Sequence, residues 1–98
     1  MIIRIFRAAP RAGHESAYER LIRINSVDLV RAQPGLVALY AGQAIGDDAH
    51  SEIVMVSVWE DQAAMEAFTG PDWQTPVALP DEDQLVTFTE VRSYATWT

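Results

Sequence analysis

The chain has 98 residues, with 14 acidic and 7 basic side chains, a formal net charge of −7 and no cysteine. This length predicts a single domain over residues 1–98, and an apolar fraction of 49% is too high for a disordered protein. The absence of cysteine excludes disulfides and thiol nucleophiles, and no lysine is present to form a Schiff base. No apolar run approaches the roughly 18 residues of a membrane span, no leader is recognisable, and the chain is acidic. We therefore expect a cytoplasmic protein with neither a nucleic-acid nor a membrane partner.

The first half of the chain predicts a strand, a helix and a second strand. Residues 1–9 are rich in strand-forming Ile and Phe and run up to a proline. Residues 13–32 predict a helix that ends at a Gln-Pro-Gly breaker. Residues 36–45 predict the next strand, which a Gly-Asp-Asp turn joins to the following one.

The second half predicts a strand, a short helix and a last strand. Residues 52–59 predict the third strand, which forms a hairpin with the second. Asp61 is suited to cap a short helix that closes at Gly70. A proline-rich segment, residues 71–83, separates this helix from the last strand at 85–97. The order βαββαβ predicts an α+β, ferredoxin-like fold, with a four-stranded antiparallel sheet and both helices on one face.

The third strand is apolar on both of its faces. One face carries Ile53, Met55, Ser57 and Trp59, and the other carries Val54, Val56 and Val58. Two helices can cover only one face of the sheet, whereas an antiparallel sheet with a free face normally alternates with polar residues there. A second copy of the chain is the simplest cover, so we expect a homodimer that packs through its sheets.

Four features occur in a characteristic order: the opening strand, Gly13 at the start of the first helix, PGLVALY at 34–40 and VSVWEDQAAMEAF at 56–68. In these features, over nearly its whole length, the chain resembles the antibiotic biosynthesis monooxygenase family of the dimeric α+β barrel superfamily. The segment 56–68 is similar to the family's third-strand Trp, here Trp59, followed by an acidic cap and the second helix.

The resemblance implies a dimeric α+β barrel with a pocket in each subunit, between sheet and helices, for a flat aromatic or polyketide-like molecule. Characterised members oxygenate phenolic polycyclic compounds without metal or flavin, because the electron-rich substrate itself reduces oxygen. A related branch binds and degrades haem. Met55 and Met65 stand where the oxygenases have an Asn and a Tyr, and Phe6 and Val77 where the haem-degrading branch has an Asn and a His.

Two polar residues of the first helix are candidates for catalysis. At 100° per residue its inward stripe is centred on Ala17, Tyr18, Leu21 and Leu29, with Ile24 at the edge. Asn25 and Asp28 fall on this stripe, and each buried polar group left without a partner costs about 1–3 kcal/mol. In a pocket, Asp28 could accept a phenolic proton and Asn25 could orient an oxygen. Otherwise they lie at a fraying helix end, or bond to the backbone or to an arginine such as Arg7.

Trp59 is the third candidate catalytic residue, since it could stack on a flat ligand; the alternative is a plain core residue. The residues expected to line the pocket are Phe6, Tyr18, Met55, Met65, Phe68 and Trp73. Trp73 lies in the proline-rich segment, where it could close the pocket as a lid or simply anchor the loop.

Two acidic clusters have simpler explanations than metal binding. The hairpin carries Asp47, Asp48, His50 and Glu52. Their spacing matches no established ligand pattern, and hairpin tips are polar because they are wet, so we expect no metal. The run 81–83 predicts a solvated turn.

The sequence thus predicts a cofactor-independent monooxygenase, an oxidoreductase, that acts on an aromatic or polyketide-like phenol as a homodimer. No metal and no organic cofactor are expected. Two alternatives stay open: a haem-binding or haem-degrading protein, and a non-catalytic small-molecule-binding or stress-response dimer. In the last case side chains such as Phe6, Met55, Met65 and Phe68 would fill the pocket.

Overall fold

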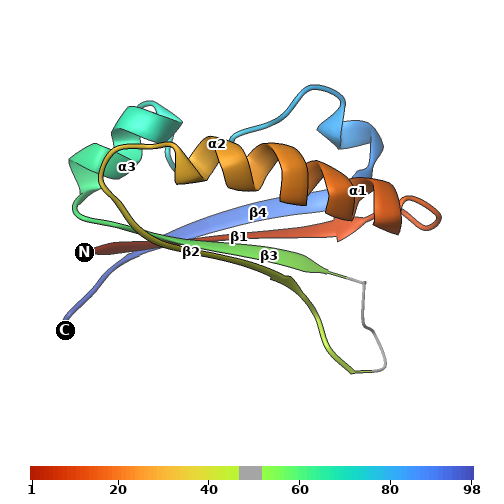
Figure 1. The fold of residues 1–98 in the computed structure, drawn as a ribbon, viewed down its shortest axis with the longest axis horizontal. Coiled ribbons are helices and arrows are strands. Elements are labelled where there is room, and N and C mark those ends of the chain that lie inside the picture. The colour runs from red at the N-terminus through yellow and green to blue at the C-terminus, as the bar shows by residue number, and fades with distance from the viewer. Residues whose placement is uncertain (47–51) are drawn as a thin grey trace.

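The structure, a computed structural model, describes residues 1–46 and 52–98 (Figure 1). Its main elements are β1 (Ile2–Pro10), α1 (Glu15–Leu21), α2 (Val27–Arg31), β2 (Leu36–Gln43), β3 (Ile53–Trp59), α3 (Gln62–Thr69) and β4 (Val86–Ala95). A π-helical turn, η1 (Ile22–Ser26), joins α1 to α2, and a short 3₁₀ turn, η2 (Glu82–Gln84), precedes β4. The predicted hairpin turn lies outside the described residues.

The four strands form one antiparallel sheet in the order β2-β3-β1-β4. The helices α1, α2 and α3 all lie on the same side of the sheet, as Figure 1 shows. The expected α+β, ferredoxin-like fold is therefore confirmed. In the part of the chain that the structure describes, no helix is long and apolar enough to cross a membrane.

The first helix buries a different stripe from the one expected. Its buried side chains are Tyr18, Ile22, Ser26 and Val30, at intervals of four residues. The hydrogen bonds of η1 span five residues instead of four, so this turn holds more than 3.6 residues and keeps side chains four apart in line.

This change of helical pitch corrects the expectation for the polar residues of the helix. Asn25 and Asp28 are both exposed, not inward, because a projection at 100° per residue misplaces residues within and beyond η1. Leu29 and Ile24 are also exposed, by 42% and 51%. Tyr18, which precedes η1, is fully buried as expected.

The start of α3 follows from its sequence. Asp61 has extended backbone angles, and its Oδ1 accepts a hydrogen bond of 2.8 Å from the backbone N–H of Ala64, which confirms the predicted N-cap. Gly35 lies directly against this helix: a Cβ built on Gly35 would come within 2.6 Å of the Ala64 Cβ. Gly35 also has a φ of +82°, which favours glycine. Only glycine at this position therefore allows the turn that precedes β2 to pack against α3.

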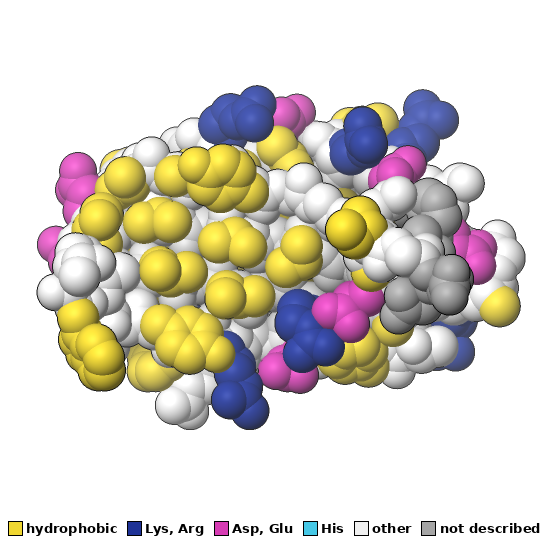
Figure 2. All heavy atoms as spheres, turned by 90° about the horizontal axis from the view of Figure 1, so that it is seen from below, with side chains coloured by type: hydrophobic (Ala, Val, Ile, Leu, Met, Phe, Trp, Pro, Cys, Tyr) yellow, Lys and Arg dark blue, Asp and Glu magenta, His cyan; other side chains and the backbone are white. Residues whose placement is uncertain are grey.

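The face of the sheet away from the helices is called the outer face below. Its side chains in the ladder are Ile3, Ile5 and Arg7 of β1, Ala38, Tyr40 and Gly42 of β2, Val54, Val56 and Val58 of β3, and Phe88, Glu90, Arg92 and Tyr94 of β4. Figure 2 shows a broad apolar area on this side of the molecule, with charged side chains beside it. The prediction that β3 is apolar on both faces is therefore borne out in the structure.

The charges of the outer face are paired with each other. The Nε of Arg7 lies 2.5 Å from Oε1 of Glu52, its Nη1 lies 3.5 Å from Oε2 of Glu90, and Arg92 contacts the same Glu90 at 3.3 Å. The hydrogen bond and charge of Arg7 hold the pKa of the Glu52 carboxyl below its usual value. Arg7 is thus engaged on the outer face and forms no contact with Asn25 or Asp28 among the described residues.

Candidate functional site

A cavity that is partly open to solvent, called the interior cavity below, lies where the first helix, the sheet, α3 and the proline-rich segment meet. Its volume is about 40 Å³, and it is lined by Arg4, Phe6, Ser26, Leu29, Val30, Met55, Phe68, Val77, Leu79 and Glu82. This is the position, between sheet and helices, at which the sequence predicts a binding pocket. Its walls are mostly apolar, and a few polar groups converge on it, as in ligand sites generally.

The cavity as it stands has room for water but not for a flat polycyclic molecule. A water molecule requires roughly 10–15 Å³ of such space, whereas sites for drug-sized ligands are about 300–1,000 Å³. In this conformation the cavity is therefore smaller than the pocket that the family resemblance implies. Val77 and Leu79 of the proline-rich segment form one wall, so displacement of that segment is the direct way to enlarge the cavity.

Arg4 brings a positive charge to the cavity wall. It lies on β1 with only 5% of its surface exposed, and its Nη1 and Nη2 donate hydrogen bonds to the backbone carbonyls of Trp73 (2.5 Å) and Thr75 (3.3 Å). Burial lowers the pKa of its guanidinium below the usual value. Within residues 1–46 and 52–98, Arg4 forms no ion pair with a carboxylate.

Glu82, which also lines the cavity, forms a buried pair with Tyr18 of the first helix. The hydroxyl of Tyr18 donates a hydrogen bond of 2.6 Å to Oε2 of Glu82, and the backbone N–H of Leu79 donates one of 3.1 Å to Oε1. Burial raises the pKa of the Tyr18 phenol well above its ordinary value, and the hydrogen bond and charge of Glu82 raise it further. The expectation of a fully solvated turn at 81–83 is wrong for Glu82, which is only 5% exposed, because its carboxylate is enclosed by these two donors.

These two arrangements fasten the proline-rich segment at both ends. Arg4 holds the carbonyls of Trp73 and Thr75 at the beginning, and Glu82 joins the end of the segment to the first helix through Tyr18. The part between these two attachments includes Val77 and Leu79, which line the cavity. This wall of the cavity is therefore held in place from both ends.

The structure brings together three of the six residues expected to line a pocket. Phe6, Met55 and Phe68 line the cavity, whereas Tyr18 and Met65 are enclosed in the core. Trp73 is half-buried and packs against the core cluster that contains Trp59 and Met65. This packing fits the alternative considered for Trp73, that it anchors the loop.

Trp59 belongs to the core and does not line the cavity. Its side chain is fully buried, its indole N–H donates a hydrogen bond of 3.0 Å to the Ser57 hydroxyl, and its ring stacks on Phe68 at 5.6 Å between centroids. Its polar group and one ring face are thus occupied by neighbours, so Trp59 supports the cavity through Phe68 instead of facing a ligand.

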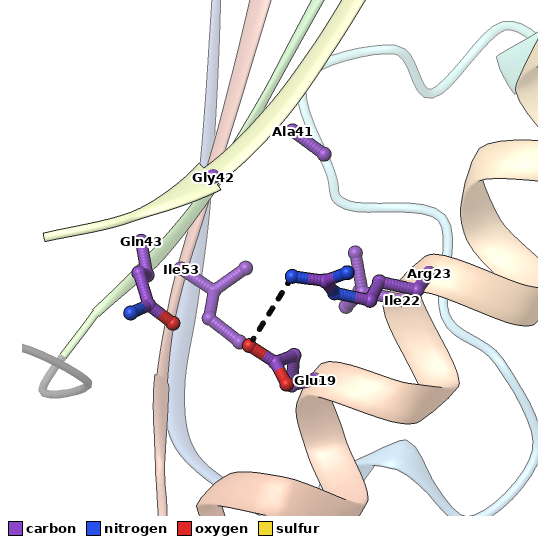
Figure 3. A pocket seen from close by; sticks show the side chains of 7 residues that line it. All are labelled: Glu19, Ile22, Arg23, Ala41, Gly42, Gln43 and Ile53. Atoms are coloured by element: carbon purple, nitrogen blue, oxygen red, sulfur yellow. Dashed lines mark ion pairs between the residues drawn. The ribbon is translucent and has the colours of Figure 1, made fainter.

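A second hollow, a groove of about 260 Å³, lies between the first helix and the ends of β2 and β3 (Figure 3). Glu19 and Arg23 extend from the helix into it and form an ion pair at 3.7 Å, opposite Gly42 of β2. The groove contains no aromatic side chain, and its charged pair is exposed to solvent. The interior cavity is therefore the better candidate site, since it combines aromatic walls with buried ionisable groups.

No group of three or more potential metal ligands occurs within residues 1–46 and 52–98. Of the four hairpin residues considered for a metal, Asp47, Asp48 and His50 lie outside the described residues, and Glu52 is engaged by Arg7.

Neither Arg4 nor Glu82, the two charged residues of the cavity, stands out in the sequence as a candidate site residue. Strand alternation alone could have found Arg4, since it shares the face of β1 with Phe6. No comparable signal exists for Glu82, because its position depends on the path of an irregular segment.

The fold and cavity together define a small ferredoxin-like α+β protein with a cavity under its helices. Solved structures share this fold throughout. Rv0793 from Mycobacterium tuberculosis is 20% identical, with a TM-score of 0.77 over 99% of this chain and 95% of its own. PA3566 from Pseudomonas aeruginosa is 19% identical, with a TM-score of 0.74 over 99% of this chain and 94% of its own. A variant of SnoaB, a cofactor-independent oxygenase from Streptomyces nogalater, is 19% identical, with a TM-score of 0.73 over 99% and 93%.

No curated protein matches the sequence significantly. The model of the antibiotic biosynthesis monooxygenase family, however, matches residues 1–74, about three quarters of the chain. The chain therefore belongs to the antibiotic biosynthesis monooxygenase family, as the resemblance indicated.

Proposed function

We propose that this protein is a cofactor-independent monooxygenase that oxidises a small phenolic aromatic or polyketide-like molecule in the interior cavity. The observation that carries the proposal is the family match over residues 1–74, on a fold whose helix-covered side holds a cavity with aromatic walls. SnoaB, which shares the fold, is itself a cofactor-independent oxygenase. The proposal includes action in the cytoplasm, with no nucleic-acid or membrane partner.

The reaction balances without an external reductant. Anthrone and O₂ give anthraquinone and water: two C–H bonds at one carbon are lost, one oxygen atom forms the new carbonyl and the other leaves as water. The substrate supplies all four electrons that O₂ accepts. The protein then has to bind the substrate, exclude bulk water and favour the ionised form that donates electrons, and Arg4 is placed to stabilise such an anion.

Oxygen uptake with anthrone or 1-naphthol tests this function, combined with ¹⁸O₂ labelling of the product. We expect uptake by the metal-stripped protein and one labelled oxygen per product molecule. Ser26→Leu places a larger side chain in the cavity wall and should abolish oxygen uptake. Ser16→Leu, at an exposed position of the same helix, should leave uptake unchanged. Absence of uptake in the unmodified protein, or undiminished uptake in Ser26→Leu, would contradict the proposal.

The small size of the cavity favours one alternative, a non-catalytic dimer whose interior is filled by its own side chains. Met65 is 1% exposed and Phe68 stacks on Trp59, so the space is already largely occupied. This alternative predicts that saturating anthrone or naphthol causes neither oxygen uptake nor a change in the thermal unfolding temperature. A ligand-induced rise in that temperature without uptake would instead support a binding protein.

The proposal also includes a homodimer that packs through the outer face. Val54, Val56 and Val58 of β3 lie beside Ile3 and Ile5 of β1 there. Tyr40 is 68% exposed and Tyr94 48% exposed on the same face, a large apolar area for a lone soluble subunit.

Sedimentation at micromolar concentration tests the dimer. Val56→Asp should give a folded monomer, because it would bury a carboxylate at the centre of the interface. Ile24→Asp introduces the same charge at an exposed helix position and should leave the dimer intact. A stable single subunit in the unmodified protein would contradict this part of the proposal.

A further inference from the structure

The buried guanidinium of Arg4 has no negatively charged partner within the described residues. Removing one charged group from water costs several kcal/mol, a cost that proteins normally offset with an opposite charge. Arg4 has only two backbone carbonyls, those of Trp73 and Thr75. These two hydrogen bonds engage one N–H of each terminal nitrogen, and both acceptors are neutral.

Glu82 does not fill this position. It lines the same cavity, but its two oxygens accept hydrogen bonds from the Tyr18 hydroxyl and the Leu79 N–H, and it forms no ion pair with Arg4. Apart from Ser26, the other residues that line the cavity are apolar or aromatic, with Phe6 and Phe68 among them.

We infer that Arg4 is an anion-binding residue, and that the natural ligand of the cavity is a planar aromatic molecule with a carboxylate or an ionised phenol directed at its guanidinium. This deepens the proposed function, on which it rests, by assigning the ligand an acidic group. Two parallel hydrogen bonds from a guanidinium to a carboxylate are stronger than single bonds to neutral carbonyls. An acidic ligand can therefore displace the carbonyls of Trp73 and Thr75 from Arg4.

The same exchange would also enlarge the cavity. The carbonyls that Arg4 holds belong to the segment that also contributes Val77 and Leu79 to the cavity wall. When the ligand takes over the guanidinium, the beginning of the segment is released and this wall can move outward. Binding and opening are thereby linked through one side chain.

Calorimetric titration with two probes of the same shape tests the inference: 2-naphthoate, an anion at pH 7.5, and 2-naphthamide, which is neutral. The unmodified protein should bind the naphthoate at least about tenfold more tightly, the effect of one charge-assisted hydrogen-bonded pair. Equal affinity for the two probes, or no binding of either at millimolar concentration, would overturn the inference without any substitution being needed.

Substitutions of Arg4 test whether the preference for the naphthoate depends on this residue. Arg4→Met should remove the preference for the naphthoate, and Arg4→Lys, which keeps the charge but not the paired donors, should retain part of it. Arg20→Met changes the net charge equally at an exposed helix position and should leave the preference unchanged. If Arg4→Met still prefers the naphthoate, Arg4 is not the anion-binding residue.

The outcome is separable from that of the oxygenase proposal. Oxygen uptake with anthrone but no preference for the naphthoate would refute the anion site and leave oxygenation standing. A clear preference without uptake of oxygen would support the anion site and count against oxygenation.

Discussion

The buried hydrogen bond between Tyr18 and Glu82 provides the sharpest test of how the cavity is held together. Tyr18→Phe removes the hydroxyl that donates to Oε2 of Glu82 at 2.6 Å and leaves that oxygen without its donor in a site only 5% exposed. A hydrogen bond to a charged group is worth about 1.5–3 kcal/mol, so we expect a loss of about 2 kcal/mol in the free energy of unfolding. For a domain of this size that lowers the midpoint of thermal unfolding by about 10 °C.

Urea denaturation measures the loss, with Ser16→Ala as the control because Ser16 is exposed on the same helix and should change stability by less than about 0.5 kcal/mol. A double-mutant cycle with Glu82→Gln assigns the effect to the pair and should give a coupling energy above about 1 kcal/mol. If Tyr18→Phe unfolds at the same urea concentration as the unmodified protein, the hydrogen bond between Tyr18 and Glu82 does not stabilise the fold. The end of the proline-rich segment is then not held by this pair.

The dependence on pH provides an independent check of the same pair. Burial and Glu82 raise the pKa of the Tyr18 phenol above the unfolded value of about 10. The unfolded chain therefore loses this proton first, and the contribution of Tyr18, complete below pH 10, is lost above it at about 1.4 kcal/mol per pH unit. The stability difference between the unmodified protein and Tyr18→Phe should stay constant from pH 8 to 9 and shrink from pH 10 to 11. A difference that stays constant up to pH 11 would show that Tyr18 is not buried against a carboxylate.

Two further predictions concern local structure. Gly35→Ala should cost about 3 kcal/mol, because it combines a left-handed backbone with a Cβ 2.6 Å from Ala64, whereas Gly13→Ala, with a similar φ of +84° but open space, should cost only about 1–2 kcal/mol. Equal losses in urea denaturation would show that the contact with Ala64 carries no weight. Asp61→Ala should cost about 1 kcal/mol by removing the cap of α3, and Asp61→Asn should retain most of it; a neutral alanine variant would contradict the capping role.

Much of the fold was predictable because its signals are local. The breaker before β2, the Asp61 cap and the alternation in β3 each act within a few residues, and each element that they define appears within two residues of its expected bounds. The family assignment depends on the same features, since the matched region, residues 1–74, contains them all.

The polar residues of the site were harder to predict, for two different physical reasons. Asn25 and Asp28 were misplaced because η1 changes the pitch of the helix, and no residue of the segment signals a π-helical turn. Glu82 was missed because a charged residue in an irregular segment resembles a solvated one unless the path of the chain is known. Only Arg4 had a usable signal, its shared strand face with Phe6.

The position of Arg4 bears on how this family member can differ from the oxygenases that it resembles. Met55 lines the cavity and stands where the family resemblance implies an Asn in the oxygenases, so the cavity lacks a polar group at this position. Met55 pairs with Phe6 across β3 and β1, two residues along from the pair of Arg4 with Ser57. A charged donor therefore reaches the same cavity from the neighbouring strand. Because a guanidinium forms stronger hydrogen bonds with anions than with neutral oxygens, the inferred role of Arg4 favours an acidic ligand in this cavity.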